Sequence, residues 1–229
     1  YELACMIAGS NYGMKFCIND SLRHALKNFK EYQPTGLVLV PLFLTTMYKK
    51  ILSEARLSRQ LAFLCDSLCH GRGFTTPGGA EAGFWINREF ERIGLMKFGS
   101  SYGKRVFDGK GKVGHNIVGM LPGSKYFSRD RYVVVGAHYD HLGELSGKMY
   151  PGADANALIN LAEMLMGIRN YGKSHNYNVI FVAFDGKEHD MAGSKAFWRM
   201  IENGDLTDPQ TGKVITKEKI SLMVNIDQI

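Results

Sequence analysis

The run Tyr132–Ala137, with the sequence YVVVGA, decides the fold of this chain. It is a continuous series of apolar, largely β-branched residues, which is typical of a strand that is buried on both faces of a sheet. Two later runs have the same character, Asn178–Phe184 (NVIFVAF) and Ile220–Ile226 (ISLMVNI). The sequence therefore predicts three buried strands.

Segments with the apolar spacing of helices alternate with these runs. One such segment, Ala157–Ile168, separates the first run from the second, and Met191–Asn203 separates the second from the third. Strands that alternate with helices predict an α/β fold, with a mostly parallel central sheet between helices on both faces in three layers. Further elements are expected upstream: helices at residues 48–69 and 80–93, a loop at residues 75–79 (TTPGG), and a short strand at residues 116–121.

The composition is that of a globular protein, with 229 residues of which 45% are hydrophobic and 22% charged. This favours one α/β domain at residues 48–229 and an N-terminal segment of unknown role at residues 1–47. The apolar run Leu37–Leu44 is interrupted by Pro41 and is shorter than the roughly 20 residues that a transmembrane helix needs. The net charge of +6 is spread along the chain, so we expect neither a transmembrane helix nor a nucleic-acid partner.

Cys65 and Cys69 lie four residues apart in a segment with helical spacing, which places them on one face. Two apolar core residues are the favoured interpretation. A disulfide or a metal role remains the alternative.

Each predicted buried strand is followed by acidic or imidazole residues. The first leads into residues 138–141 (HYDH), the second into residues 185–189 (DGKEH), and the third into Asp227. Residues 152–156 (GADAN) open the helix between the first two strands. Because the carboxyl ends of parallel strands form one edge where ligands bind, these side chains are expected to meet. Imidazole and carboxylate groups are zinc ligands.

Each of these residues also has a purely structural interpretation. A polar residue just after a strand is commonly a turn former or a helix N-cap, which would account for Asp154 and for Asp185 before Gly186. A single histidine such as His138 is more often hydrogen-bonded within a core than bound to a metal. The coincidence of all the candidates at one edge favours a site.

Four segments resemble one family in sequence and order: residues 133–143 (VVVGAHYDHLG), 151–156, 181–194 (FVAFDGKEHDMAGS) and 224–227 (VNID). The family is that of the secreted two-zinc aminopeptidases, whose fold is shared by glutamate carboxypeptidases and glutaminyl cyclases. The lead-in, residues 61–95, is similar as well, so the resemblance covers about three-quarters of the chain. It implies a zinc exopeptidase-like fold that is incomplete after the Asp227 strand, with the final histidine ligand and the last strands beyond residue 229.

The resemblance implies a role for four matching residues. His138 corresponds to a histidine ligand of one metal, and Asp140 corresponds to the carboxylate that orients this histidine. Glu188 corresponds to a ligand of the other metal, and Asp227 to a ligand of the first. Zinc is the cofactor that the family implies, and peptides or small peptide-like molecules are the implied substrates. The family also implies a secreted or periplasmic location.

Two positions depart from the family. Ala155 stands where an aspartate bridges the two metals, and Lys187 stands where a glutamate is the general base. Alanine cannot bridge two cations, and a protonated lysine cannot accept a proton from water. Loss of a general base alone slows such reactions roughly 10²–10⁴-fold. We therefore hypothesise weak or no peptidase activity and a metal-free site in which Lys187 pairs with Glu188 or Asp227 in place of a cation.

Three alternatives remain at this stage. The chain could be an active zinc aminopeptidase in which Asp154, next to the lost bridge, takes over as a ligand. It could be a non-catalytic binding module. A one-zinc acyl transferase of the glutaminyl cyclase type is disfavoured, since that group also has an acidic residue at the position of Ala155.

Overall fold

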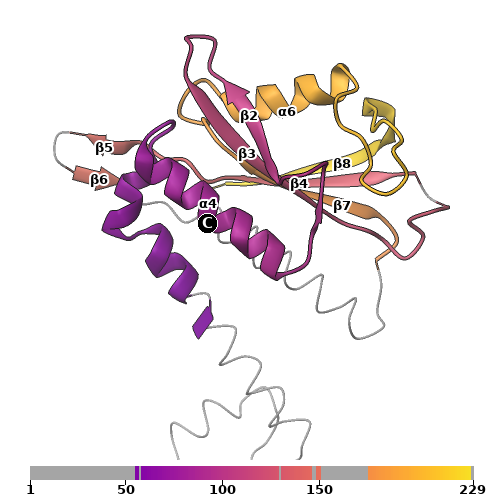
Figure 1. Cartoon of the computed structure of the whole chain (residues 1–229), viewed down its shortest axis with the longest axis horizontal. Helices are drawn as coiled ribbons and strands as arrows, with labels where there is room; N and C mark the ends of the chain where they lie inside the picture. The colour runs from indigo at the N-terminus through magenta and orange to yellow at the C-terminus, as the bar shows by residue number, and fades with distance from the viewer. Residues whose placement is uncertain (1–54, 57, 129, 146–147, 151–174, 228–229) are drawn as a thin grey trace, which may run out of the picture. The chain divides into compact units, whose positions relative to one another are not determined.

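A computed structural model describes residues 55–56, 58–128, 130–145, 148–150 and 175–227 (Figure 1). The chain divides into two compact units, Tyr1–Ala55 and Arg56–Ile229, and the second is described here. The predicted N-terminal segment 1–47 lies outside the described residues, as does the predicted helix 157–168. None of the described helices is both long and apolar enough to cross a membrane.

The described elements follow the predicted order, with additions. Residues 58–64 are helical and precede the 3-10 helix η1. In chain order the elements are η1 (Ser67–Arg72), α4 (Pro77–Arg92), β1 (Met96–Lys97), β2 (Gly103–Phe107), β3 (Val113–Leu121), β4 (Tyr132–His138), β5 (Gly143–Leu145), β6 (Lys148–Tyr150), β7 (Asn178–Phe184), α6 (Ala192–Glu202), η2 (Lys217–Lys219) and β8 (Ile220–Ile226).

The central sheet has the order β1-β3-β7-β4-β8, and β2 pairs with β3 beside this path. Strand β4 runs parallel to both β7 and β8, whereas β3 runs antiparallel to β1, β2 and β7. The prediction of a mostly parallel sheet thus holds for the three apolar strands and is wrong for the other half. A short turn joins β2 to β3, and such a hairpin connection can only produce antiparallel strands.

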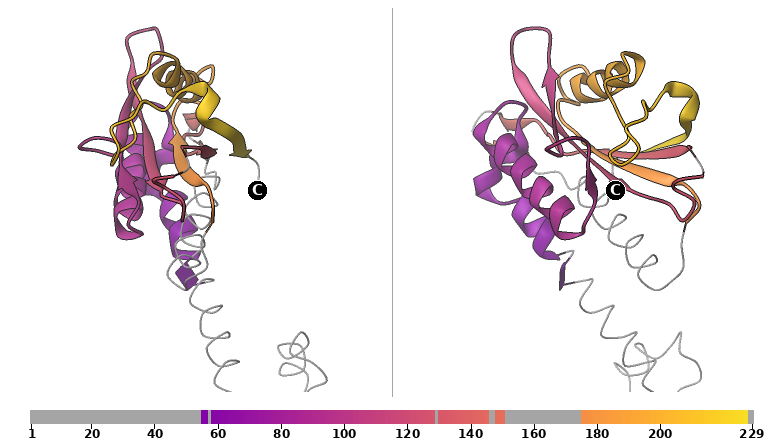
Figure 2. Two further views of the ribbon diagram at one scale, coloured as in Figure 1. Left: turned by 90° about the vertical axis from the view of Figure 1, so that its right-hand side faces the viewer. Right: turned by 45° about the vertical axis from the view of Figure 1, so that its right-hand side comes forward.

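Two hydrophobic cores, one on each face of the sheet, produce the predicted three layers (Figure 2). Residues 179, 181 and 183 of β7 belong to the core that also holds Ile86 and Phe90 of α4. Residues 180, 182 and 184 belong to the core with Phe197 and Ile201 of α6. Because alternate residues of a strand face opposite sides, burial on both sides requires the continuous apolar sequence of this strand.

The predicted loop at residues 75–79 is wrong, since α4 begins at Pro77. The Thr76 side chain caps the helix by accepting from the Gly79 N–H at 3.1 Å. Proline fits the first turn because its missing N–H would have no hydrogen-bond partner within the helix. Gly78 and Gly79 fit because a Cβ on either would lie 2.1 Å from the Cys69 carbonyl oxygen or 2.3 Å from that of Gly73. Close packing of the preceding loop therefore explains glycines that resemble a turn.

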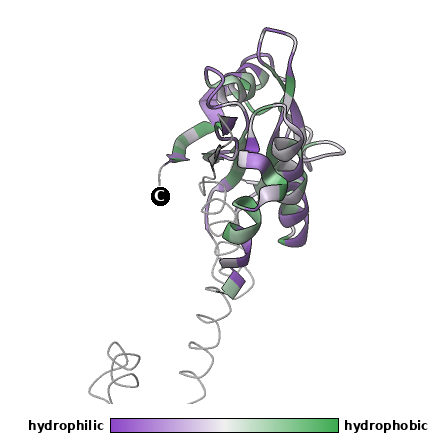
Figure 3. Ribbon diagram, turned by 90° about the vertical axis from the view of Figure 1, so that its left-hand side faces the viewer, coloured by the Kyte–Doolittle hydropathy of each residue, from purple (hydrophilic) through white to green (hydrophobic). Residues whose placement is uncertain are grey.

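The predicted strand at residues 220–226 exists as β8, but the prediction that it is buried is wrong. Leu222 is 55% exposed and Met223 44%. Figure 3 shows hydrophobic segments in green on the strand that leads to the C-terminus. Strand β8 is the last in the order of the described strands, and of its residues only Ile220 and Ile226 pack against the two described cores, so the middle of the strand is exposed.

The two cysteines of the described region are both free thiols. Cys69 is buried, as expected of a core residue, and Cys65 is exposed. Burial raises the pKa of the Cys69 thiol, which keeps it protonated and unreactive.

Candidate functional site

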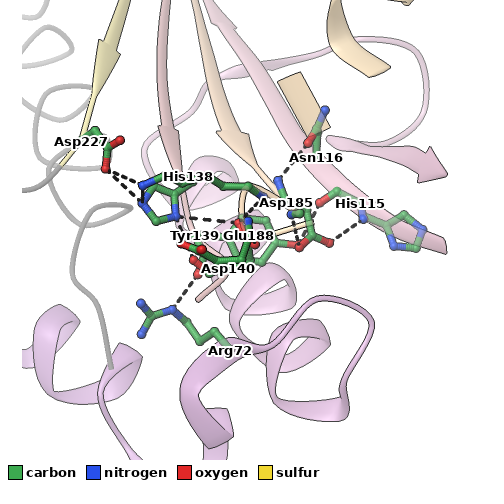
Figure 4. A network of polar contacts seen from close by, with 11 residues as sticks. Arg72, His115, Asn116, His138, Tyr139, Asp140, Asp185, Glu188 and Asp227 are labelled. Carbon is green, nitrogen blue, oxygen red and sulfur yellow. Dashed lines mark hydrogen bonds and ion pairs between the residues drawn. The ribbon is translucent and has the colours of Figure 1, made fainter. Parts of the chain in front are cut away.

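The carboxyl ends of β4, β7 and β8 bring three predicted site residues together. His138 is the last residue of β4, Lys187 follows β7, and Asp227 follows β8. The Lys187 Nζ atom donates to Asp227 Oδ1 at 2.8 Å and lies 3.2 Å from His138 Nε2. His138 Nε2 and Asp227 Oδ1 are 3.3 Å apart. Figure 4 shows the His138 and Asp227 side chains directed toward each other.

The tautomer of His138 follows from its partners. The Nδ1 atom lies 2.8 Å from the carbonyl oxygen of Asp140, which can only accept, so Nδ1 carries the proton. The Nε2 atom lies 3.2 Å from Lys187 Nζ and 3.3 Å from Asp227 Oδ1. Lys187 thus contacts both an imidazole and a carboxylate. The hydrogen bond from Lys187 is the main reason why the pKa of Asp227 lies below its ordinary value.

Asp140 is fully buried beneath this group and fixes the chain that carries Lys187. Its Oδ1 atom accepts from the Lys187 N–H at 3.0 Å, and its Oδ2 atom accepts from the Glu188 N–H at 3.2 Å. The carboxylate lies 3.8 Å from His138 Nδ1, so it is the carbonyl of Asp140 that makes the shorter contact with the histidine.

Arg72 is buried, with 2% of its surface exposed, and it holds the main chain of residues 139–141. Its Nε atom donates to the carbonyl oxygen of Tyr139 at 2.6 Å, and its own carbonyl accepts from the His141 N–H at 3.0 Å. Both bonds bracket Asp140, and Figure 4 shows Arg72 below this residue. Arg72 therefore positions the segment that supports His138.

A second buried carboxyl, Asp185, lies at the start of the turn before Lys187 and is 4% exposed. Its two oxygens accept from the His115 N–H at 3.0 Å and the Gly186 N–H at 2.9 Å, while its own N–H donates to Asn116 Oδ1. Burial is the main cause that raises the pKa of Asp185 to about 7. Because both oxygens are occupied, Asp185 supports the turn, which agrees with the structural interpretation of its sequence.

His138, Lys187 and Asp227 line a small pocket of about 110 Å³. Apolar Phe184 and Met191 form part of its wall, together with Ser194 and Asn225. A larger surface depression of about 420 Å³ lies between the end of α6 and residues 216–218, but none of the predicted site residues lines it. Because the chemical groups lie in the smaller pocket, we take that one as the candidate site.

The other predicted site residues are placed differently. Glu188 is exposed, and its contribution to the network is its main-chain N–H; its side chain does not line the pocket. Asp154 and Ala155 lie outside the described residues. The sequence predicts no role for Arg72 or Asn116, although Arg72 lies in the lead-in segment that resembles the zinc aminopeptidases. The Asn116 side chain accepts from the Asp185 N–H and donates to the Gly193 carbonyl at 2.7 Å. No local sequence signal indicates these contacts.

The described residues do not fit a two-zinc centre. His138 and Asp227 do have suitable spacing, since a tetrahedral zinc holds an imidazole nitrogen and a carboxylate oxygen about 3.3 Å apart. However, the Lys187 ammonium lies at hydrogen-bonding distance from both of these atoms. Within the described part of the chain, no group of three His, Cys, Asp or Glu side chains is arranged to hold a metal.

Solved structures share this fold at low sequence identity. LapB from Legionella pneumophila is 20% identical with a TM-score of 0.53, covering 76% of this chain and 43% of LapB. LapA from Legionella pneumophila is 15% identical with a TM-score of 0.55, covering 99% of this chain and 59% of LapA. A glutaminyl cyclase from an Acidobacteriales bacterium is 18% identical with a TM-score of 0.53, covering 74% of this chain and 55% of the cyclase. The chain thus spans roughly half the length of these proteins.

Sequence comparison gives the family. No curated protein sequence is significantly similar to this chain. The model of peptidase family M28, by contrast, matches residues 116–229, the stretch that contains His138, Asp140, Lys187, Glu188 and Asp227. The structural matches agree with the zinc exopeptidase-like α/β fold expected from the sequence. Through these residues, the chain belongs to peptidase family M28.

Proposed function

We propose that this chain is a member of family M28 that binds peptides without hydrolysing them, and that Lys187 acts as an internal cation in place of metal. The observation that carries the proposal is the bridge that Lys187 forms between His138 Nε2 and Asp227 Oδ1, at 3.2 and 2.8 Å. The aspartate charge is thereby neutralised by the protein itself, and the histidine nitrogen beside it is also in contact with Lys187.

Electrostatics explains why this arrangement opposes metal binding. A dication at His138 and Asp227 would lie within a few ångströms of the Lys187 ammonium, and like charges at such distances repel by several kcal/mol even at an effective dielectric constant of about 20. Lys187 would have to leave, and its main chain is held by Asp140 through the N–H bond of 3.0 Å. The substitution of Ala155 for the bridging aspartate of related peptidases removes a further anionic ligand.

Two of the groups that line the pocket are unsuited to replace the general base. Lys187 donates to Asp227 Oδ1 and has no lone pair while protonated. The nearest buried carboxyl in the pocket wall, Asp185, accepts main-chain hydrogen bonds with both oxygens. Neither of these two groups is therefore placed to accept a proton from an attacking water.

The pocket beside Lys187 supports binding of a small part of a peptide. Phe184 and Met191 offer apolar surface, and Ser194 and Asn225 offer hydrogen-bonding groups, in a space of about 110 Å³. Such a combination of apolar walls and a few polar groups is typical of ligand sites. Peptides are the ligands that membership of a peptidase family implies.

Metal content and hydrolysis test the proposal together. The natural protein should retain less than stoichiometric zinc after dialysis and should show no zinc-dependent hydrolysis of aminoacyl-nitroanilides, while peptides still bind in titration calorimetry. Replacement of the pair, Lys187→Glu with Ala155→Asp, should raise zinc affinity. A natural protein that keeps tightly bound zinc and cleaves these substrates would instead be the active aminopeptidase, with rearranged ligands such as Asp154.

A further inference from the structure

The hairpin of β2 and β3 has two chemically different faces. In its register Phe107 is opposite Val113 and Arg105 is opposite His115. Val106 and Gly114 point the other way; Val106 is fully buried in a cluster with Phe74 and Ala192. The outer face therefore carries Arg105, Phe107, Val113 and His115. On this face Phe107 is 58% exposed and Val113 41%.

The turn between the strands adds two exposed cations to the end of the hairpin. Asp108 defines the turn, since its Oδ1 atom accepts from the main-chain N–H groups of Lys110 at 2.7 Å and Lys112 at 3.0 Å. The lysine side chains themselves are exposed. In Figures 1 and 2 the hairpin projects beyond the rest of the sheet, at the top of each view. The projecting end thus presents an apolar pair next to Lys110 and Lys112.

The cations of this end are not paired with carboxylates. Within the described part of the chain, Arg105, Lys110 and Lys112 form no ion pair within 4.0 Å. The Asp108 carboxylate accepts main-chain hydrogen bonds of the turn, and Asp190 is ion-paired with Lys195. Lys104, in contrast, turns inward and donates to the carbonyl of Ser101 at 3.1 Å. Three unpaired cations beside two exposed apolar side chains form a surface that matches an anionic partner with an apolar interior.

We propose that this hairpin tip (Arg105, Phe107, Lys110, Lys112 and Val113) docks on the surface of a membrane that contains anionic phospholipid. Phe107 and Val113 enter the headgroup layer, while the three cations lie at the level of the lipid phosphates. This division of apolar and basic groups is the one found in segments that lie in a membrane interface. The proposal is independent of the chemistry at Lys187.

A nucleic acid is the competing anionic partner, and the geometry favours it less. Binding of a single strand uses a basic groove with several aromatic side chains on which successive bases stack. The hairpin tip is a narrow projection with one aromatic ring, Phe107, paired with an aliphatic residue. A bilayer accepts such a tip without any groove.

Sedimentation of the full-length protein with vesicles tests this. Binding to vesicles that contain phosphatidylserine should exceed binding to phosphatidylcholine vesicles and should fall as salt is raised. The pair Lys110→Ala with Lys112→Ala should weaken binding about 25-fold, since each cation near an anionic surface contributes roughly fivefold. Lys125→Ala with Lys213→Ala, two exposed lysines elsewhere, is the matched control and should change little.

The apolar part has its own control. Phe107→Ser should weaken vesicle binding about tenfold through loss of partial burial in the interface, whereas Phe127→Ser, at a residue that is 82% exposed, should not. All variants change exposed side chains, so unchanged thermal unfolding would show that each is folded. Equal binding to both kinds of vesicle, equal binding by the hairpin and control variants, or binding only to a single-stranded oligonucleotide would each overturn the proposal.

Discussion

Lys187 donates from its ammonium to Asp227 Oδ1 at 2.8 Å, and this bond joins the ends of β7 and β8, which are not neighbours in the sheet. Strand β4 lies between them and supplies His138 as the third member. The sequence hypothesis that Lys187 pairs with Glu188 or Asp227 is thus confirmed for Asp227. The side chains of Lys187 and Asp227 are 31% and 36% exposed. Because water screens a pair this exposed, we expect it to contribute little to stability and to matter mainly for metal binding.

The stability effect of Lys187 should be small. Lys187→Met removes the ion pair, but partly exposed pairs are screened by water and contribute about 0–1 kcal/mol. We expect the free energy of unfolding in urea to change by no more than about 1 kcal/mol. A loss of several kcal/mol would show that Lys187 determines the fold and not mainly the chemistry of the site.

Arg72 should matter much more for stability. Arg72→Met leaves the carbonyl of Tyr139 without its donor in a buried environment, which costs about 3 kcal/mol or more. The exposed Arg88 provides the control, since Arg88→Met should change the free energy of unfolding by less than about 0.5 kcal/mol. Similar values for the two variants in chemical unfolding would refute the positioning role.

Asp185 predicts a pH dependence of stability. Burial raises the pKa of this carboxyl from its ordinary 3.8 to about 7 in the folded state. The folded protein therefore holds the proton more tightly than the unfolded chain, and the stability this contributes is present below about pH 4 and is lost as pH rises to about 7. The total is on the order of 2–4 kcal/mol.

The variant Asp185→Asn isolates this contribution, because an amide cannot ionise. The difference in unfolding free energy between the natural protein and the variant should shift in favour of the variant between pH 5 and pH 8. Urea titrations of both proteins at the two pH values measure it. A difference that does not vary with pH would mean that Asp185 is already ionised at pH 5.

Gly114 provides space for Asp185. A Cβ at this position would lie 2.3 Å from Asp185 Oδ2 and 2.3 Å from the Phe74 ring, so Gly114→Ala should destabilise the protein by about 1–3 kcal/mol or more. The control is Gly103→Ala in the neighbouring strand, where the nearest atom would be 3.6 Å away, and it should be nearly neutral. Equal unfolding temperatures for the two variants would contradict the packing described here.

How far the fold follows from the sequence can be seen strand by strand. The strands β4, β7 and β8 were predictable because each is a continuous run of mostly apolar residues. β2 was not, because Lys104 and Arg105 interrupt its pattern and only one of its faces is buried, at Val106. The exposure of the β8 side chains could not be predicted either. It depends on what packs against the faces of the strand and not on the composition of the strand itself.

The candidate site shows the same limit. The meeting of His138, Lys187 and Asp227 follows from strand ends at one edge, which the alternation of strands and helices predicts. The direction of the Glu188 side chain does not follow, because it depends on how Asp140 holds the main chain of the turn. The role of Arg72 depends on contacts with residues 67 positions later in the chain, to which no local pattern refers.

Zinc content of the purified natural protein, measured by elemental analysis after equilibration with zinc and dialysis, tests the central claim most directly. If Lys187 replaces the metal, the protein retains well below one zinc per chain, and the variant with Lys187→Glu and Ala155→Asp retains more. One or two zinc ions held tightly by the unaltered protein would contradict the claim.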